Sequence, residues 1–168
     1  MKKVTLGALV LLVLAAAPAL AGSATSSFTV SATVLTNCTI STVGIVFGNY
    51  DPTSSTPLDG TGSVVVTCTA GTSGKILMGQ GANPATGSTD AAALRQMAGL
   101  VLTSQRLRYD LYQDASRSTS WGNTTATGES YTASTILPVT VTIYGRVPIN
   151  QNAEANVYND TVTATVTF

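Results

Sequence analysis

The chain has 168 residues, with eight basic side chains, eight acidic side chains and no histidine. It contains no cluster of Lys or Arg that could follow a phosphate backbone, so we expect no nucleic-acid partner. The lack of histidine removes the usual general base, the Ser-His-Asp and Cys-His arrangements and the commonest zinc ligand. We therefore expect a protein that is not an enzyme and that holds no metal or cofactor.

The first 21 residues have the pattern of a secretory signal peptide. A positive start at Lys2 and Lys3 precedes an apolar run from about Leu6 to Ala17, and small residues follow up to Ala21. The run is shorter than the roughly 20 residues of a membrane-spanning helix, so we expect no transmembrane segment. Ala24 is an alternative cleavage position. The sequence predicts export, and residues 1–21 are left out of the expected fold.

The chain contains two cysteines, Cys38 and Cys68. Export brings both into an oxidising compartment, where a disulfide between them is the expected state. Closing a loop of about 30 residues in this way stabilises a domain by roughly 3–4 kcal/mol in the loop-entropy model.

The mature part of the chain reads as short strands separated by turns. Residues 27–34 alternate, with Phe28, Val30, Ala32 and Val34 on one face. A short apolar run at 45–47 ends at a turn over 48–52. Further strands are expected at 63–69 and 75–78, and residues 79–96 are expected to be a loop, although 90–97 has the composition of a short helical turn.

The second half continues the pattern. We expect strands at 99–103, 107–112, 135–144 and 158–168, with turns around 114–123. Pro138 has no backbone donor and therefore marks a strand start, an edge or a bulge. Arg106 and Arg108 alternate along one strand and are interpreted as a solvated face. The last expected strand runs to the final residue, Phe168. About seven short strands with turn signals predict an immunoglobulin-like β-sandwich.

Other chemistry has weak support in the sequence. The carboxylate pairs Asp110 with Asp114 and Asp51 with Asp59 could serve a glycosidase, but Asp in such turns commonly binds its own backbone. Trp121 and Tyr131 could stack on a sugar, although packing is the simpler role for a single Trp. No run of acidic residues at alternating loop positions indicates a calcium site.

Several segments together resemble the spore coat protein U domain family, which overlaps the pilin subunits of the archaic chaperone-usher pathway. The resemblance covers nearly the whole mature chain, with one departure at 155–157, where the family often has a Gly. The resembling segments are 28–34 before Cys38, Phe47-Gly-Asn-Tyr-Asp-Pro52, 63–69, 107–115 with Trp121-Gly122, Tyr144-Gly-Arg-Val-Pro148, and 158–168.

The resemblance implies an incomplete immunoglobulin-like β-sandwich that is completed by donor-strand exchange. In such families a periplasmic chaperone first lends a strand, and an outer-membrane usher then exchanges it for the N-terminal extension of the next subunit. Residues 22–36 would be this extension and 37–168 the pilin domain. The donor face would be Phe28, Val30, Ala32 and Val34, and the acceptor groove would be lined by Val162, Ala164, Val166 and Phe168.

These features predict a structural subunit of a pilus or fimbria at the bacterial surface, serving adhesion or biofilm formation. Its partners would be other pilus subunits, the chaperone and the usher. Two alternatives stay open: a tip adhesin whose loops around Trp121 recognise a glycan, and a coat or matrix protein of the same fold. If 27–34 is an ordinary first strand instead of a donor, the domain would be closed by itself.

Overall fold

The computed structural model describes residues 21–168, so the predicted signal peptide lies outside the described residues except for Ala21. The described chain folds into strands and turns without a helix, as the Ser, Thr and Val-rich composition predicts. None of it therefore forms a helix that could cross a membrane. The strands are β1 (Cys38–Val43), β2 (Leu58–Cys68), β3 (Thr72–Met78), β4 (Arg95–Gly99), β5 (Arg106–Tyr112), β6 (Glu129–Ala133), β7 (Val139–Val147), β8 (Tyr158–Asn159) and β9 (Ala164–Thr167).

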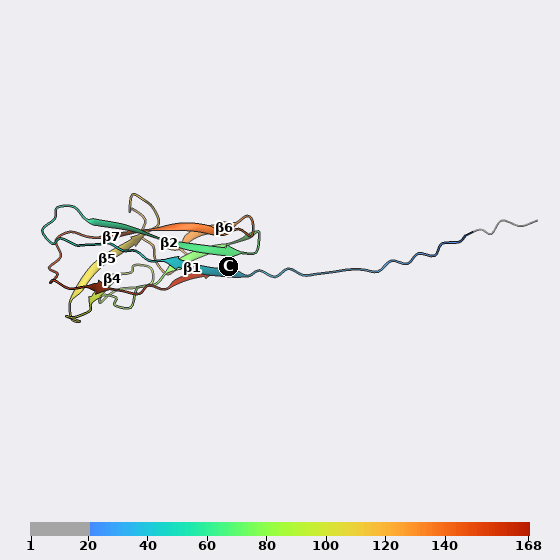
Figure 1. Ribbon diagram of the computed structural model, residues 1–168. Helices are drawn as coiled ribbons and strands as arrows, with labels where there is room; N and C mark the ends of the chain where they lie inside the picture. The colour runs from blue at the N-terminus through green and yellow to red at the C-terminus, as the bar shows by residue number, and fades with distance from the viewer. Residues whose placement is uncertain (1–20) are drawn as a thin grey trace, which may run out of the picture. The chain divides into compact units, whose positions relative to one another are not determined.

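The strands form two antiparallel sheets (Figure 1). The larger sheet has the order β1-β2-β7-β5-β4-β8, and the smaller one has the order β6-β3-β9. In the larger sheet, β2 and β7 form the longest pair. They run side by side from Leu58, which lies opposite Val147, to Val66, which lies opposite Val139. The predicted all-β fold is confirmed.

The core lies between the two sheets, because alternate side chains of each strand face inward. In β5 the side chains of Leu107, Tyr109 and Leu111 are buried, whereas Arg106 and Arg108 are exposed, as predicted. The larger sheet contributes Val64, Val66, Ile143 and Val147, the smaller sheet contributes Ile76, Met78, Tyr131 and Ala133, and the connecting loops contribute Trp121.

The strands rich in β-branched residues lie where the alternation predicts them. β2, β3, β5 and β7 overlap the expected segments, and Pro138 directly precedes β7, so it marks the start of a strand. Residues 79–94 form a loop, as expected.

Other expectations about strands were wrong. The strand expected at 99–103 is β4 at 95–99, because the chain turns after Gly99, whose amide donates to Gln105 O at 3.1 Å. β6 was not predicted at all. The single strand expected at 158–168 is divided into β8 and β9, which belong to different sheets. Residues 27–34 and 45–47 form no strand in the described chain.

The described chain has two parts that are considered separately. Residues 34–168 form one compact unit that contains both sheets. Residues 21–33 belong to the other part and have no regular secondary structure. They include the expected donor residues Phe28 and Val30, whose side chains are 87% and 82% exposed.

Candidate functional site at the open edges of the two sheets

Each sheet has an edge strand that faces the other sheet without pairing to it. β1 pairs with β2 alone and β9 pairs with β3 alone in the described chain. The backbone of residues 44–49, which continues from β1, makes no hydrogen bond to any described residue. Unpaired backbone groups at such an edge are a template for one more strand.

A groove separates these two edges. One part has a volume of about 210 Å³ and lies between residues 42–47 and 158–164. A second part, of about 730 Å³, continues between residues 45–52 and 153–159. The two parts share Ile45, Phe47, Met97, Tyr158 and Asn159, so they form one continuous feature, which we call the groove. Further apolar lining comes from Val43, Met78, Leu111, Ile143, Val162 and Ala164.

The first wall of the groove rests on three glycines of the larger sheet. Gly60 of β2 lies directly opposite Gly145 of β7. A Cβ on Gly60 would come within 2.7 Å of the Ile45 side chain, and one on Gly145 within 2.7 Å of Phe47 Cζ. A Cβ on Gly62 would come within 2.6 Å of the Val43 carbonyl oxygen and within 2.9 Å of the Ile45 side chain. The bare backbone here lets Ile45 and Phe47 lie flat on the sheet and hold residues 44–47 as a wall.

The second wall is fixed by a polar cluster where β8 ends. The hydroxyl of Tyr109 donates to Asp160 Oδ2 at 2.6 Å. The other oxygen of this carboxylate accepts from the Ala82 amide at 2.9 Å and from Asn83 Nδ2 at 3.1 Å. Burial first, and the hydrogen bond to Asp160 second, raise the pKa of Tyr109 well above its usual value. These contacts end β8 and bring the chain across to the smaller sheet.

A buried arginine in β4 holds two strands that line the groove together. Arg95 is 2% exposed, and its guanidinium donates to the backbone carbonyls of Met78, Gly79 and Trp121 at 2.7–2.9 Å. Burial lowers the pKa of Arg95. Its hydrogen bonds tie β4 to the end of β3, and these two strands contribute Met97 and Met78 to the lining of the groove.

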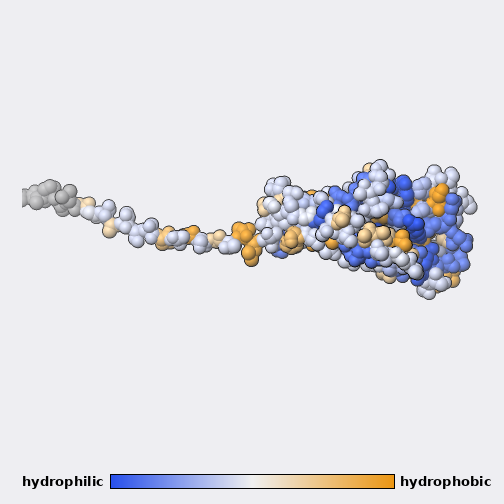
Figure 2. Space-filling model, turned by 180° about the vertical axis from the view of Figure 1, so that it is seen from behind, coloured by the Kyte–Doolittle hydropathy of each residue, from blue (hydrophilic) through white to orange (hydrophobic). Residues whose placement is uncertain are grey.

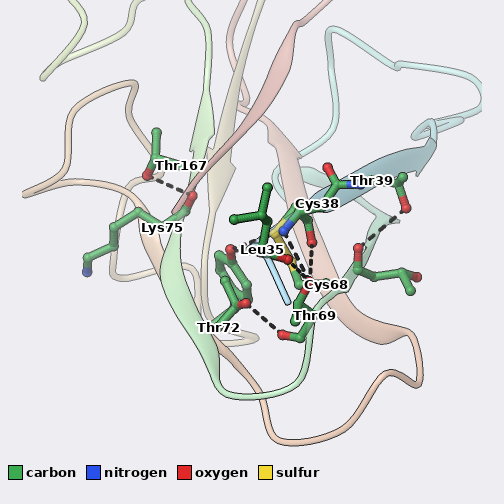
Figure 3. Close-up of a disulfide and its surroundings, with 11 residues drawn as sticks. Leu35, Cys38, Thr39, Cys68, Thr69, Thr72, Lys75 and Thr167 are labelled. Carbon is green, nitrogen blue, oxygen red and sulfur yellow. Dashed lines mark hydrogen bonds between the residues drawn. A yellow bond between two sulfur atoms is a disulfide. The ribbon is translucent and has the colours of Figure 1, made fainter. Parts of the chain in front are cut away.

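The chain enters the 34–168 unit beside the disulfide (Figure 3). Cys38 and Cys68 are bonded, as predicted, and their strands are in register at that pair. Thr69 holds the entering chain: its amide donates to Asn37 O at 2.9 Å, and its hydroxyl donates to Leu35 O at 3.1 Å. The hydroxyl of Tyr131 lies 3.5 Å from Cys38 Sγ. The start of β1 is therefore fixed by covalent and hydrogen bonds together.

Comparison with known proteins places this chain in a family. Residues 24–165 match the family model of the Spore Coat Protein U domain. The chain belongs to this family. Protein U of Myxococcus xanthus is 42% identical, in an alignment that covers 90% of this chain and 88% of that protein.

A solved structure shares the fold of this spore coat protein U domain. It is the crystal structure of the CsuC–CsuE chaperone–tip adhesion subunit pre-assembly complex from archaic chaperone-usher Csu pili of Acinetobacter baumannii. The match has a TM-score of 0.54 and 26% identity and covers 81% of this chain. The chain spans 40% of the length of that solved chain. The Spore Coat Protein U domain and the pilin-like fold are structural and adhesion families, so the domain is not an enzyme.

The four acceptor residues expected from the sequence have different surroundings in the spore coat protein U domain. Val162 and Ala164 line the groove. Val166 is half-buried and packs against the core, and Phe168 is 58% exposed. Their role as acceptors stays a prediction.

Much of the groove's lining has no signal in the sequence that predicts it. The apolar run 45–47 was recognised, but its place in a wall depends on the glycines of two distant strands. Met97 and the pair of Tyr109 with Asp160 carried no local signal, because each lies in a segment with a different expected role.

The other candidate sites of the domain have structural roles. Trp121 is fully buried and donates from Nε1 to Ile76 O at 2.8 Å, so it cannot stack on a sugar at the surface. Asp51 accepts from Thr53, and Asp114 accepts from Ser116, Ser118 and Thr119, so both bind their own turns. Asp59 pairs with Arg146, and residues 21–168 contain no group of three metal-binding side chains.

Proposed function

We propose that this spore coat protein U domain protein is a structural subunit of a pilus or fimbria that polymerises by donor-strand complementation. Residues 22–36 of one subunit would enter the groove of the next. The fibre would serve adhesion or biofilm formation at the cell surface. A periplasmic chaperone and an outer-membrane usher would assemble it after export. The match to a subunit of archaic chaperone-usher pili supports this assignment of partners.

The observation that carries the proposal is the continuous groove between two unpaired strand edges. It offers backbone donors and acceptors on β1 and β9 and an apolar floor, which are the two things that an added strand needs. Left uncovered, such an edge favours aggregation.

The N-terminal segment has the complementary pattern. Phe28, Val30 and Val34 are all more than 80% exposed and alternate with Ser and Thr. Burying each of these side chains contributes about 1.5–3 kcal/mol, before the backbone ladder is counted and the ordering cost subtracted. A strand with this face on the groove would dissociate very slowly.

The test uses two variants of the full chain, one that disrupts the donor segment and one that disrupts the groove. Val30→Asp places a charge on the donor face, and Val162→Asp places one in the groove. We expect neither variant to form fibres alone, as seen by electron microscopy of the cell surface. Ser31→Asp, on the opposite face of the same segment, is the matched control and should polymerise normally.

Mixing the two variants distinguishes a defect in assembly from a defect in folding. Val30→Asp retains an intact groove and Val162→Asp an intact donor, so the two should combine into short complexes that cannot extend. Val30→Asp should also still bind the chaperone, which uses the groove. Fibres that contain Val30→Asp as their only subunit would disprove donor-strand assembly.

A further inference from the structure

Two groups of exposed apolar side chains lie at the ends of the 34–168 unit. One group surrounds the point where the chain enters, and we call it the root end: Leu35, Ile136, Leu137 and Phe168, which are 58–76% exposed. The other, the loop end, consists of Leu100, Val101, Leu102 and Val157, which are 42–81% exposed. Figure 2 shows apolar side chains on the surface at both ends of this unit.

Strand register places the two groups at opposite ends of the sandwich. At the root end, Cys38 pairs with Cys68, and Ala133, which precedes the loop of Ile136 and Leu137, pairs with Thr72. Leu58 at the other end of β2 pairs with Val147, and β5 extends further in that direction to the loop 100–105. β2 alone spans about 33 Å at 3.3 Å per residue.

The loop end is a fixed surface. The Leu100 amide donates to Val157 O at 2.8 Å, and the Val101 amide donates to Asn156 Oδ1 at 3.2 Å. The same Asn156 side chain donates from Nδ2 to Leu102 O. Three hydrogen bonds therefore hold four large apolar side chains outward, where water contact gives them no stabilisation.

The segments around the entering chain carry no charged side chain that would oppose burial of the root end. Residues 33–41, 69–72 and 132–138, which surround the entering chain, contain no Asp, Glu, Lys or Arg. A surface of this kind is typical of the centre of an interface, where charged residues are depleted.

The short linker between the donor segment and its own domain determines which surface the root end can meet, if the proposed function is correct. If residues 28–34 of one subunit fill the groove of another, only three residues separate the groove from Cys38 of the donor. These residues span at most about 14 Å over the four Cα–Cα steps. The root end of the donor must therefore lie close to one end of the acceptor's groove.

The available end is the one beside the loop end. At the opposite end of the groove the acceptor's own entering chain is bound to Thr69, next to the start of β1 and the end of β9. At the free end the groove is lined by Ala155, Asn156 and Val157. A donor segment in the groove would leave past Val157, and its domain would begin there.

We propose that the loop end of each subunit packs against the root end of the next copy, so that a second, apolar contact accompanies every donated strand. The contact joins different surfaces of identical chains, and such heterologous contacts repeat into open filaments when they do not close into a ring. The groove then provides the connection and the two ends set the angle between neighbours.

Crosslinking of assembled fibres tests this contact. Both cysteines of the chain are in the disulfide, so thiols can be added at chosen positions. In full-length Val101→Cys plus Ile136→Cys, a short bis-maleimide should join neighbouring subunits into a ladder of covalent multimers on a denaturing gel. Thr61→Cys plus Ile136→Cys, with the first thiol at the exposed middle of β2, is the control and should give no ladder.

A second variant measures the contribution of the apolar contact. Val101→Asp should still take up a donor strand but should give shorter fibres under shear, and Val101→Asp with Leu137→Lys should recover part of the lost length. Fibres that form normally but give no ladder would overturn the end-to-end contact and leave the proposed function intact. Absence of any polymer from the unaltered protein would overturn both.

Discussion

At the scale of single residues, the shape of the groove depends on glycines, which have no side chain to occupy the surface of the sheet. Gly145 gives Phe47 a flat place on the sheet, and Phe47 in turn packs against Tyr109 with ring centroids 6.2 Å apart. A methyl group on Gly145 would move an aromatic side chain, and the groove wall would move with it.

Gly145→Ala tests this dependence. The added Cβ would meet Phe47 Cζ at 2.7 Å and Ile45 Cδ1 at 2.8 Å, so we expect a loss of about 1–3 kcal/mol in the free energy of unfolding. Fibre assembly should slow as well, because the wall is displaced. Urea unfolding and the rate of polymerisation are the measurements.

The matched control is Gly44→Ala, which lies in the same wall but has no atom within 4 Å of the added Cβ. It should leave both measurements nearly unchanged. An equal effect of the two variants would mean that the wall does not depend on the glycine surface.

At the scale of elements, two cross-links join neighbouring strands at opposite ends of β2. Near its start, Asp59 lies opposite Arg146 of β7 and accepts from Nε at 2.7 Å and from a terminal nitrogen at 2.9 Å. Arg117 adds a contact to the same carboxylate at 3.2 Å. At its other end the disulfide joins β2 to β1.

The carboxylate gives a pH-dependent prediction. The hydrogen bond from Arg146 lowers the pKa of Asp59 below its usual value near 3.8. Because the folded-state pKa is the lower one, this contribution to stability is complete above about pH 5 and is lost as pH falls through the folded-state pKa. It amounts to about 0.5–1 kcal/mol, since the pair is partly exposed.

We therefore expect Asp59→Asn to reduce the free energy of unfolding at pH 7. We also expect this variant to lose less stability than the unaltered protein as the pH falls below about 5. Urea titrations across this range are the measurement. Glu129→Gln removes a carboxylate that makes no ion pair within the described chain and is the control. An unchanged acid profile in Asp59→Asn would assign the acid loss to other groups.

The disulfide gives a larger effect on stability. Replacing both cysteines by Ser, in Cys38→Ser plus Cys68→Ser, opens a loop of 30 residues and should reduce the free energy of unfolding by about 3–4 kcal/mol. The yield of exported subunit should fall accordingly. Thermal unfolding of the two proteins in oxidising and reducing buffer is the check, and equal melting temperatures in all four samples would contradict it.

The elements also show what local sequence can predict. β5 and β7 were recognised because alternate apolar residues fit a strand that is buried on one face. β4 contains a buried Arg95 whose partners are carbonyls from other loops, so its pattern is not apolar alternation. The first half of β2 contains Asp59, Gly60 and Gly62, residues that are depleted in strands. The two glycines are required here by the close approach of residues 43–47, and Asp59 pairs with Arg146.

The end of the chain was misread for a related reason. Residues 158–168 alternate throughout, yet Tyr109 and Asn83 bind Asp160 and divide the segment between two sheets. Such long-range hydrogen bonds leave no periodic signal. The groove was predicted from the family resemblance, whereas its first wall became visible only in three dimensions.

At the scale of the whole molecule, the groove predicts that a supplied strand would stabilise the domain. A second copy of residues 24–36, joined to Phe168 through a short Gly and Ser linker, would begin at the root end and run antiparallel to β9. We expect this protein to be monomeric and to unfold at a higher temperature, because three large side chains gain about 1.5–3 kcal/mol each on burial.

The control carries Phe28→Asp and Val30→Asp in the added copy only. It should have the melting temperature of the unaltered protein and should still polymerise. Calorimetry and size-exclusion chromatography distinguish these outcomes. A fused protein that gained no stability would show that the groove does not accept this strand.

The position of the disulfide has a mechanical consequence for such a fibre. Tension along an inserted strand reaches each domain through Asn37 and arrives first at Cys38, which is covalently joined to β2. The force therefore passes into a strand that is flanked by neighbours on both sides and acts as shear along its ladder. Without that bond, the load would rest on the hydrogen bonds between β1 and β2 alone.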